Sequence, residues 1–243
     1  MWNIRTMRER GDKNLPQDMA VAFVRWKRNS LSDATESYGK YETLVCDACG
    51  HTEWFARDFT PDAHADVSAF ARGGPKACLE CEDTEFWEIE DTKERNHHGE
   101  PVQLRVVLRG FPDSWLGRFN TYVCRGCGWT AWHATELDGL ATDRSNGITR
   151  RGDAPPCRHC ASTKRWCIES MRETGDVYVT KLHVHLRLGF FYAEAIGHFA
   201  TEVCRRCGYT EWCARDYGEL RHDPKKGVAL LERALRAEAG PYR

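Results

Sequence analysis

Five Cys-x-x-Cys pairs, set in two alternating contexts, constrain the fold of this chain more than any other feature. Three pairs lie in segments that align without gaps, at 41–59, 119–137 and 199–217. We call this pattern knuckle B. An aromatic residue lies five positions before the first cysteine, a glycine directly follows the second cysteine, and a tryptophan lies five positions after the second cysteine. Two further segments, 78–90 and 157–169, form knuckle A, in which the tryptophan lies six positions after the second cysteine. The order B, A, B, A, B indicates an internal repeat of about 78 residues.

The spacing of these cysteines suits a metal ion. Two residues between cysteines allow a tight turn to direct both sulfurs at one ion, and a following glycine can adopt the positive φ that such a turn requires. Apolar and polar residues alternate on both sides of each B pair, which is the period expected of strands. Each B knuckle is therefore predicted to be a β-hairpin with a metal at its tip. The tryptophans are expected to pack over the metal site rather than to stack on nucleic-acid bases.

The wider sequence favours metal binding over disulfides. The first residues carry charges but no following apolar segment, so a secretory signal is not expected, and no apolar run is long enough to span a bilayer. We expect a cytoplasmic protein, and in a reducing compartment CxxC pairs indicate metal or redox sites. The predicted cofactor is Zn²⁺, about two ions per chain.

If two knuckles form one metal site, five knuckles leave one without a partner. Two ways of pairing the other four are possible. Pairing each A knuckle with the following B knuckle is favoured, because the segments between them, 101–109 and 179–192, have strand character. Pairing B with the following A is the alternative. The favoured pairing leaves Cys46 and Cys49 either in a metal site shared between chains or in a metal-free turn, and the aromatic flanks of that knuckle favour the metal-free turn. The predicted ligands are Cys78, Cys81, Cys124 and Cys127 in one site, and Cys157, Cys160, Cys204 and Cys207 in the other.

The predicted fold is mainly β, with tandem zinc ribbons built of hairpin knuckles and three-stranded sheets, some short helices and a C-terminal α-helix. The expected units are an N-terminal half-ribbon at 1–75, ribbons at 76–140 and 155–221, and a helix at 222–243. Asp223 suits the start of this helix, Gly240 its end, and Val228, Leu231 and Leu235 form an apolar stripe along it.

The unit at 157–212 resembles a bacterial zinc-ribbon family described as predicted nucleic-acid-binding proteins. The resemblance lies in a CxxC knuckle, an intervening hairpin, and a second knuckle that ends in Gly-Tyr-Thr-Glu at 208–211. It implies a zinc ribbon with these four cysteines as ligands, and an inferred role in nucleic-acid binding. The other two B knuckles depart from the signature, reading Gly-Trp-Thr-Ala at 128–131 and Gly-His-Thr-Glu at 50–53.

The B-then-A intervals are also similar to the spacing in rubredoxins, which carry electrons on iron. Cys81 and Cys160 are followed by Glu82 and Ala161, however, so the second glycine of the rubredoxin pattern is missing. An electron carrier is the least favoured of the alternatives.

Charge and motifs limit the function. The formal net charge is −1, and two Zn²⁺ with eight thiolates would bring it to about −5, which is unlike a general nucleic-acid binder. We find no catalytic motif and no evident small-molecule substrate, so we expect a non-enzymatic module that binds protein or itself. The alternative is a nucleic-acid-binding protein that uses the basic face of the second ribbon. The candidate contacts there are Arg150, Arg151, Arg158, Lys164 and Arg165.

Overall fold

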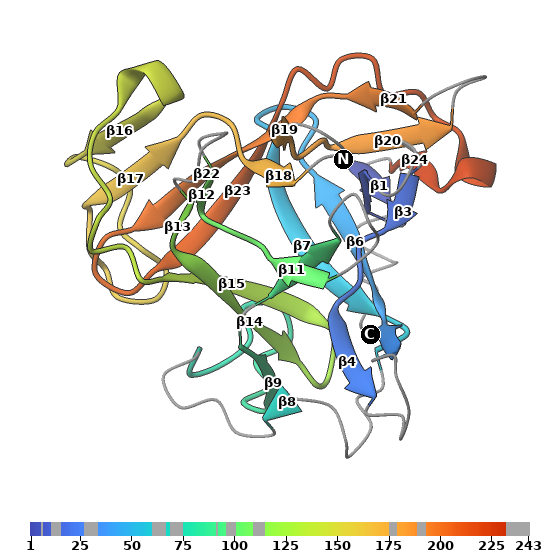
Figure 1. Cartoon of the computed structure of the whole chain (residues 1–243), viewed down its shortest axis with the longest axis horizontal. Coiled ribbons are helices and arrows are strands. Elements are labelled where there is room, and N and C mark those ends of the chain that lie inside the picture. The colour runs from blue at the N-terminus through green and yellow to red at the C-terminus, as the bar shows by residue number, and fades with distance from the viewer. Residues whose placement is uncertain are drawn as a thin grey trace.

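The computed structural model describes residues 1–5, 7–10, 16–26, 34–59, 67–68, 75–90, 92–95, 101–108, 115–174, 179–188 and 193–231 (Figure 1). Its strands fall into three successive sets. The first is β1 (Trp2–Ile4), β2 (Arg8–Arg10), β3 (Pro16–Asp18), β4 (Ala22–Trp26), β5 (Ala34–Tyr38), β6 (Lys40–Val45) and β7 (His51–Arg57). The second is β8 (Val67–Ser68), β9 (Phe86–Ile89), β10 (Lys93–Arg95), β11 (Pro101–Gln103), β12 (Val107–Leu108), β13 (Trp115–Leu116), β14 (Arg118–Cys124) and β15 (Trp129–Thr135). The third is β16 (Ile148–Arg151), β17 (Arg165–Ile168), β18 (Arg172–Thr174), β19 (Val179–Lys181), β20 (His185–Leu188), β21 (Ala193–Ile196), β22 (His198–Cys204) and β23 (Tyr209–Arg215), followed by β24 (Val228–Leu230).

The three sets repeat one antiparallel arrangement. In each set the strand before the hairpins pairs with the first strand of the B knuckle, as β1 with β6, β9 with β14 and β17 with β22. The registers agree, because Ile4, Ile89 and Ile168 each lie opposite a buried threonine of the B knuckle. Two short hairpins lie between these strands in every set. The prediction of a mainly β protein is therefore confirmed.

The three B knuckles meet in the middle of the molecule. Their second strands, β7, β15 and β23, pair with one another in a closed ring (Figure 1). Equivalent backbone hydrogen bonds repeat around it: an alanine N–H of one strand donates to the glycine carbonyl of the next knuckle. The pairs are Ala56 with Gly128 at 2.7 Å, Ala134 with Gly208 at 2.8 Å, and Ala214 with Gly50 at 2.7 Å. The molecule thus has approximate threefold symmetry.

The core lies on this threefold axis and is aromatic. Trp54, Trp132 and Trp212 are each 1% exposed, and their ring centroids are 5.0–5.1 Å apart. Three further rings, those of Tyr41, Phe119 and Phe199, pack between them. The expectation that these tryptophans cover the metal sites is therefore wrong, and at 1% exposure they cannot stack on external bases. The shared core joins the three segments that the sequence analysis treated as separate units.

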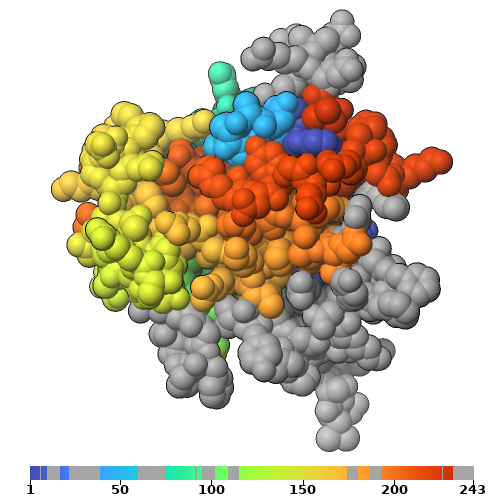
Figure 2. Space-filling model, turned by 90° about the horizontal axis from the view of Figure 1, so that it is seen from above, coloured from blue at the N-terminus to red at the C-terminus, as the bar shows by residue number. Residues whose placement is uncertain are grey.

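The predicted C-terminal helix is not seen. Residues Pro224–Lys226 form one 3₁₀ turn, Gly227 adopts a φ of 81°, and Val228–Leu230 form β24. This strand pairs with β1, so the C-terminal and N-terminal segments close the first set together. Figure 2 shows this contact as a blue patch bordered by red. The left-handed glycine ends the helical conformation, and the apolar Val228 pairs with Ile4 across the sheet. Leu235 and Gly240 lie outside the described residues.

Helical structure is otherwise scarce among the described residues. The other turn of 3₁₀ helix, η2, spans Arg144–Asn146 and is capped by Asp143. The short α-helices that were also predicted are not seen among the described residues. No helix in the described part of the chain is both long and apolar enough to cross a membrane.

Candidate metal centres

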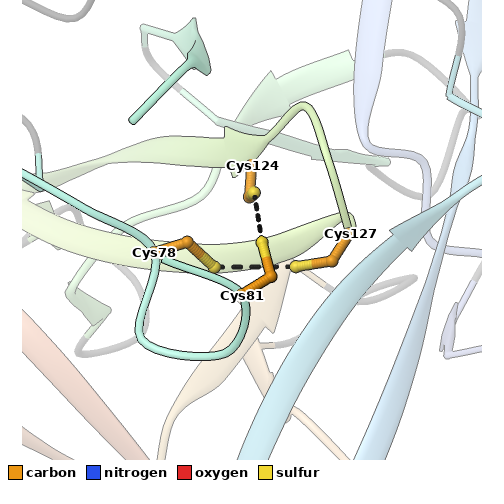
Figure 3. Close-up of side chains that lie close together, drawn as sticks. All are labelled: Cys78, Cys81, Cys124 and Cys127. Carbon is orange, nitrogen blue, oxygen red and sulfur yellow. Dashed lines mark hydrogen bonds between the residues drawn. The ribbon is translucent and has the colours of Figure 1, made fainter. Parts of the chain in front are cut away.

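Eight of the cysteines gather into two clusters of four. Each cluster joins an A knuckle to the B knuckle that follows it, which is the favoured pairing of the sequence analysis. The B-then-A pairing, on which the comparison with rubredoxin depends, is not the one that forms. In the first cluster the sulfurs of all four side chains point toward one another (Figure 3). The members are Cys78, Cys81, Cys124 and Cys127, and in the second cluster Cys157, Cys160, Cys204 and Cys207.

The sulfur separations fit a tetrahedral ion. In the first cluster, Sγ of Cys78 lies 3.6 Å from Sγ of Cys127, and Sγ of Cys81 lies 3.5 Å from Sγ of Cys124. The matching distances in the second cluster are 3.7 and 3.5 Å. Four sulfurs at the usual Zn–S distance of about 2.3 Å would stand about 3.8 Å apart. Each cluster could therefore hold a metal ion with little rearrangement.

All four turns that build the clusters have the same backbone. In each, the N–H of the residue after the second cysteine donates to the carbonyl of the first, at 2.8–3.0 Å. That residue has a positive φ in every case: 76° at Gly128, 75° at Gly208, 63° at Glu82 and 58° at Ala161. The missing glycine of knuckle A thus changes the residue but not the conformation. Two such turns facing each other make each cluster approximately twofold symmetric.

Hydrogen bonds favour the thiolate form at equivalent positions of the B knuckles. The pKa of Cys124 is lowered, chiefly by hydrogen bonds from the thiols of Cys127 and Cys78. Burial opposes ionisation of Cys204, but the backbone N–H groups of Cys207 and Arg206 lower its pKa to about 7. Because metal ligands must be deprotonated, these N–H donors prepare the turns for a cation.

The second cluster has a cationic neighbour that the sequence analysis assigned elsewhere. Arg165, predicted to contact an external anion, is 1% exposed and therefore not available to one. Its guanidinium donates to the carbonyl of Pro155 at 3.2 Å. Burial opposes its charge, but a hydrogen bond with the Cys157 thiol and nearby negative charges raise its pKa overall. Arg165 thus offsets the negative charge of the second cluster from within, whereas the equivalent position beside the first cluster holds the apolar Phe86.

The other predicted basic contacts are exposed. Arg150, Arg151, Arg158 and Lys164 all lie at the surface of the third set. Arg150 stacks on Trp166, with its guanidinium carbon 4.5 Å from the ring centroid. Arg205, which was not among the predicted contacts, has its guanidinium carbon 5.3 Å from the centroid of the same ring. Its position directly after the first cysteine of a B knuckle was the available signal, since Arg125 occupies the same place and stacks on Trp87.

A cluster of histidine and tyrosine rings lies between the two cysteine clusters and was not predicted from the sequence. The rings of His159 and Tyr209 stack at 4.2 Å, and His133 lies 5.0 Å from His159. Nδ1 of His133 is 3.2 Å from the Cys207 carbonyl. Burial lowers the pKa of His133 to about 4, so this histidine is neutral near pH 7. The second cysteine cluster therefore packs against β15, the second strand of the B knuckle that supplies Cys124 and Cys127 to the first cluster.

The fifth knuckle stands apart from both clusters. Cys46 is half-buried and Cys49 is exposed. The pKa of Cys46 is lowered by the backbone N–H groups of Cys49 and Ala48, as in the complete clusters. A cavity of about 560 Å³ opens over the third set, with Cys167 and Cys213 among its lining residues. Burial raises the pKa of both of these thiols, so they are not poised as nucleophiles.

No family of known proteins, no curated protein and no solved structure matches this chain.

Proposed function

We propose that both cysteine clusters hold Zn²⁺ in a structural role. Four sulfurs at tetrahedral separation leave no open coordination position, which is the mark of structural zinc sites. Each ion would fasten an A turn to the strand pair beside it, β9 with β14 or β17 with β22. Four thiolates also suit zinc better than the hard cations that prefer oxygen ligands.

We further propose that the chain is a non-catalytic module that recognises another protein. The observation that carries this proposal is Trp115, which is 54% exposed and covered on one face by Arg105, 5.5 Å from its ring centroid. The threefold-equivalent positions hold Ser37 and Ala195, so the fold does not need a large side chain there. Tryptophan and arginine are the residues that most often dominate protein interfaces.

The test is a comparison of retained proteins on immobilised variants. Full-length chain is incubated with a nuclease-treated lysate, and retained proteins are quantified for wild type, Trp115→Ala and Leu79→Ala. Leu79 is a matched control, because it is also an exposed apolar residue, at 42%. We expect a partner retained by wild type and Leu79→Ala, and reduced at least tenfold by Trp115→Ala. Identical sets from all three proteins would refute the role of Trp115.

Nucleic-acid binding is the second candidate, supported by the basic surface around the second cluster. Arg158, Lys164 and Arg206 are exposed there, beside the two arginines that stack on Trp166. Changing these three residues together to Glu should abolish binding of labelled DNA or RNA, and wild-type affinity should fall steeply with salt as counterions are released. The matched control changes Arg144, Arg221 and Lys225, which are exposed elsewhere. Equal loss in both triple variants would show that only the net charge matters.

A further inference from the structure

The knuckle of Cys46 and Cys49 has the geometry of a metal half-site although no A knuckle faces it. The Gly50 N–H donates to the Cys46 carbonyl at 2.8 Å, and Gly50 has a φ of 75°. The corresponding values at Gly128 and Gly208 are 2.9 Å with 76° and 2.9 Å with 75°. The turn that presents the two sulfurs is therefore the same in all three B knuckles.

This turn is held by protein contacts alone. The hydroxyl of Tyr217 donates to the carbonyls of Cys46 and Asp47, at 3.0 and 3.2 Å. Gly50 is fixed against β23, where its carbonyl accepts from the Ala214 N–H. Such preorganisation reduces the ordering cost of binding an ion or a partner.

The described part of the chain supplies only half of the ligands that the turn would need. No third Cys, His or carboxylate there lies close enough to form a ligand group with Cys46 and Cys49. The tip of the knuckle, Asp47 to Cys49, is exposed, whereas Cys127, the counterpart of Cys49, is 4% exposed. An approaching surface can reach Cys49, and Cys46 in the same turn is half-buried rather than enclosed.

A second copy of the chain carries what is missing. The two complete clusters show that a four-sulfur site consists of two turns of the same backbone, related by an approximate twofold axis. The B and A turns share the hydrogen bond to the first cysteine's carbonyl and the positive φ after the second cysteine, which is taken by glycine in B and by Glu82 or Ala161 in A. Two Cys46 knuckles facing each other across a true twofold axis would therefore reproduce the arrangement seen at Cys78, Cys81, Cys124 and Cys127.

We propose that two copies of this chain share one Zn²⁺ through Cys46 and Cys49 of each. The interface is isologous, since the same knuckle faces itself, and the site is closed once both copies are present. This inference rests on the proposal that the complete clusters hold zinc. The partner of the B knuckle that lacks an A knuckle is then the same knuckle of a second copy of the chain.

The test measures mass and metal content together on the full chain purified with zinc. Wild type should be a dimer with five Zn²⁺ per dimer, two in each chain and one between them. The double variant Cys46→Ser, Cys49→Ser should be a monomer with two Zn²⁺. The control Cys167→Ser, Cys213→Ser removes two half-buried cysteines that lie outside the CxxC pairs, and it should remain a dimer with five Zn²⁺.

Each other outcome overturns a different statement. A monomeric wild type with two Zn²⁺ shows a metal-free knuckle, and one with three shows a site completed within one chain; either result refutes the shared site. A dimer that survives the double substitution shows another interface and also refutes it. If none of the proteins holds zinc, the proposal for the complete clusters fails as well. Cobalt substitution gives a second readout, because the sulfur-to-cobalt absorption per chain should fall by one fifth in the double variant and stay constant in the control.

Discussion

At the scale of single residues, the glycine after each B pair carries two constraints at once. It closes the cysteine turn in a left-handed conformation, and it touches the neighbouring strand of the central ring. A Cβ on Gly128 would stand 2.4 Å from the carbonyl oxygen of Ala56, and one on Gly208 would stand 2.0 Å from that of Ala134. The geometry of the cysteine turn explains the first requirement, and only the threefold ring explains the second.

Gly128→Ala should therefore destabilise the whole protein by more than about 2 kcal/mol, because left-handed strain and a backbone clash add together. Urea unfolding followed by tryptophan fluorescence would measure this. Gly152→Ala is the control, since nothing lies within 4 Å of its added Cβ, and it should change stability by less than about 0.5 kcal/mol. Equal midpoints for both variants would show that the ring tolerates the clash.

The prediction that Arg165 contacts nucleic acid rested on its residue type and its place in the sequence, and it is wrong. In the sequence it lies near Arg158 and Lys164 and looks like part of one basic surface. In the structure it is buried beside Cys157, while Lys164, which directly precedes β17, is exposed. Adjacent side chains in extended backbone point to opposite sides, so a run of basic residues in the sequence does not by itself define one basic surface.

At the scale of elements, the sequence predicted the strands around each knuckle but not the end of the chain. Period-two alternation in 119–123 and 199–203 corresponds to β14 and β22. The segment after Asp223 has apolar residues at helical spacing, and that pattern predicted a helix. Residues Val228–Leu230 instead form a strand that pairs with β1. A short helix gains most of its stability from tertiary packing, and here the packing is provided by a strand.

The β1–β24 pairing should contribute measurably to stability, because it completes the first set. Ala229 lies opposite Asn3, and proline there removes a backbone donor from the ladder. We expect Ala229→Pro to lower the free energy of unfolding by at least about 1 kcal/mol and to speed hydrogen exchange in β1. Ala229→Thr keeps the donor and suits a strand, so it should leave exchange in β1 unchanged. Unchanged exchange in the proline variant would mean that β24 is dispensable.

At the scale of the whole molecule, the repeat was evident in the sequence but its closure was not. The aligned tryptophans repeat with the knuckles, and a local interpretation places each over its own metal. Only the pairing of β7, β15 and β23 shows that the three tryptophans serve one core. Contacts between residues about 80 positions apart leave no local pattern, so the sequence supplied the parts of the core without their arrangement.

Because the three sets share one core, metal removal should unfold all three together rather than unfold one set alone. Structural zinc in four-thiolate sites contributes on the order of 10 kcal/mol to folding, comparable with the total stability of a typical domain. Cys81→Ser should lower the metal content by one ion per chain and abolish the near-ultraviolet dichroism of the tryptophan cluster, although no tryptophan is changed. Cys167→Ser, outside both clusters, should retain full metal content and dichroism. A chelator should remove the ions from both clusters, and the dichroism should be lost in the same single transition. Retention of the tryptophan signal after loss of either ion would show instead that the aromatic core folds without its metal centres.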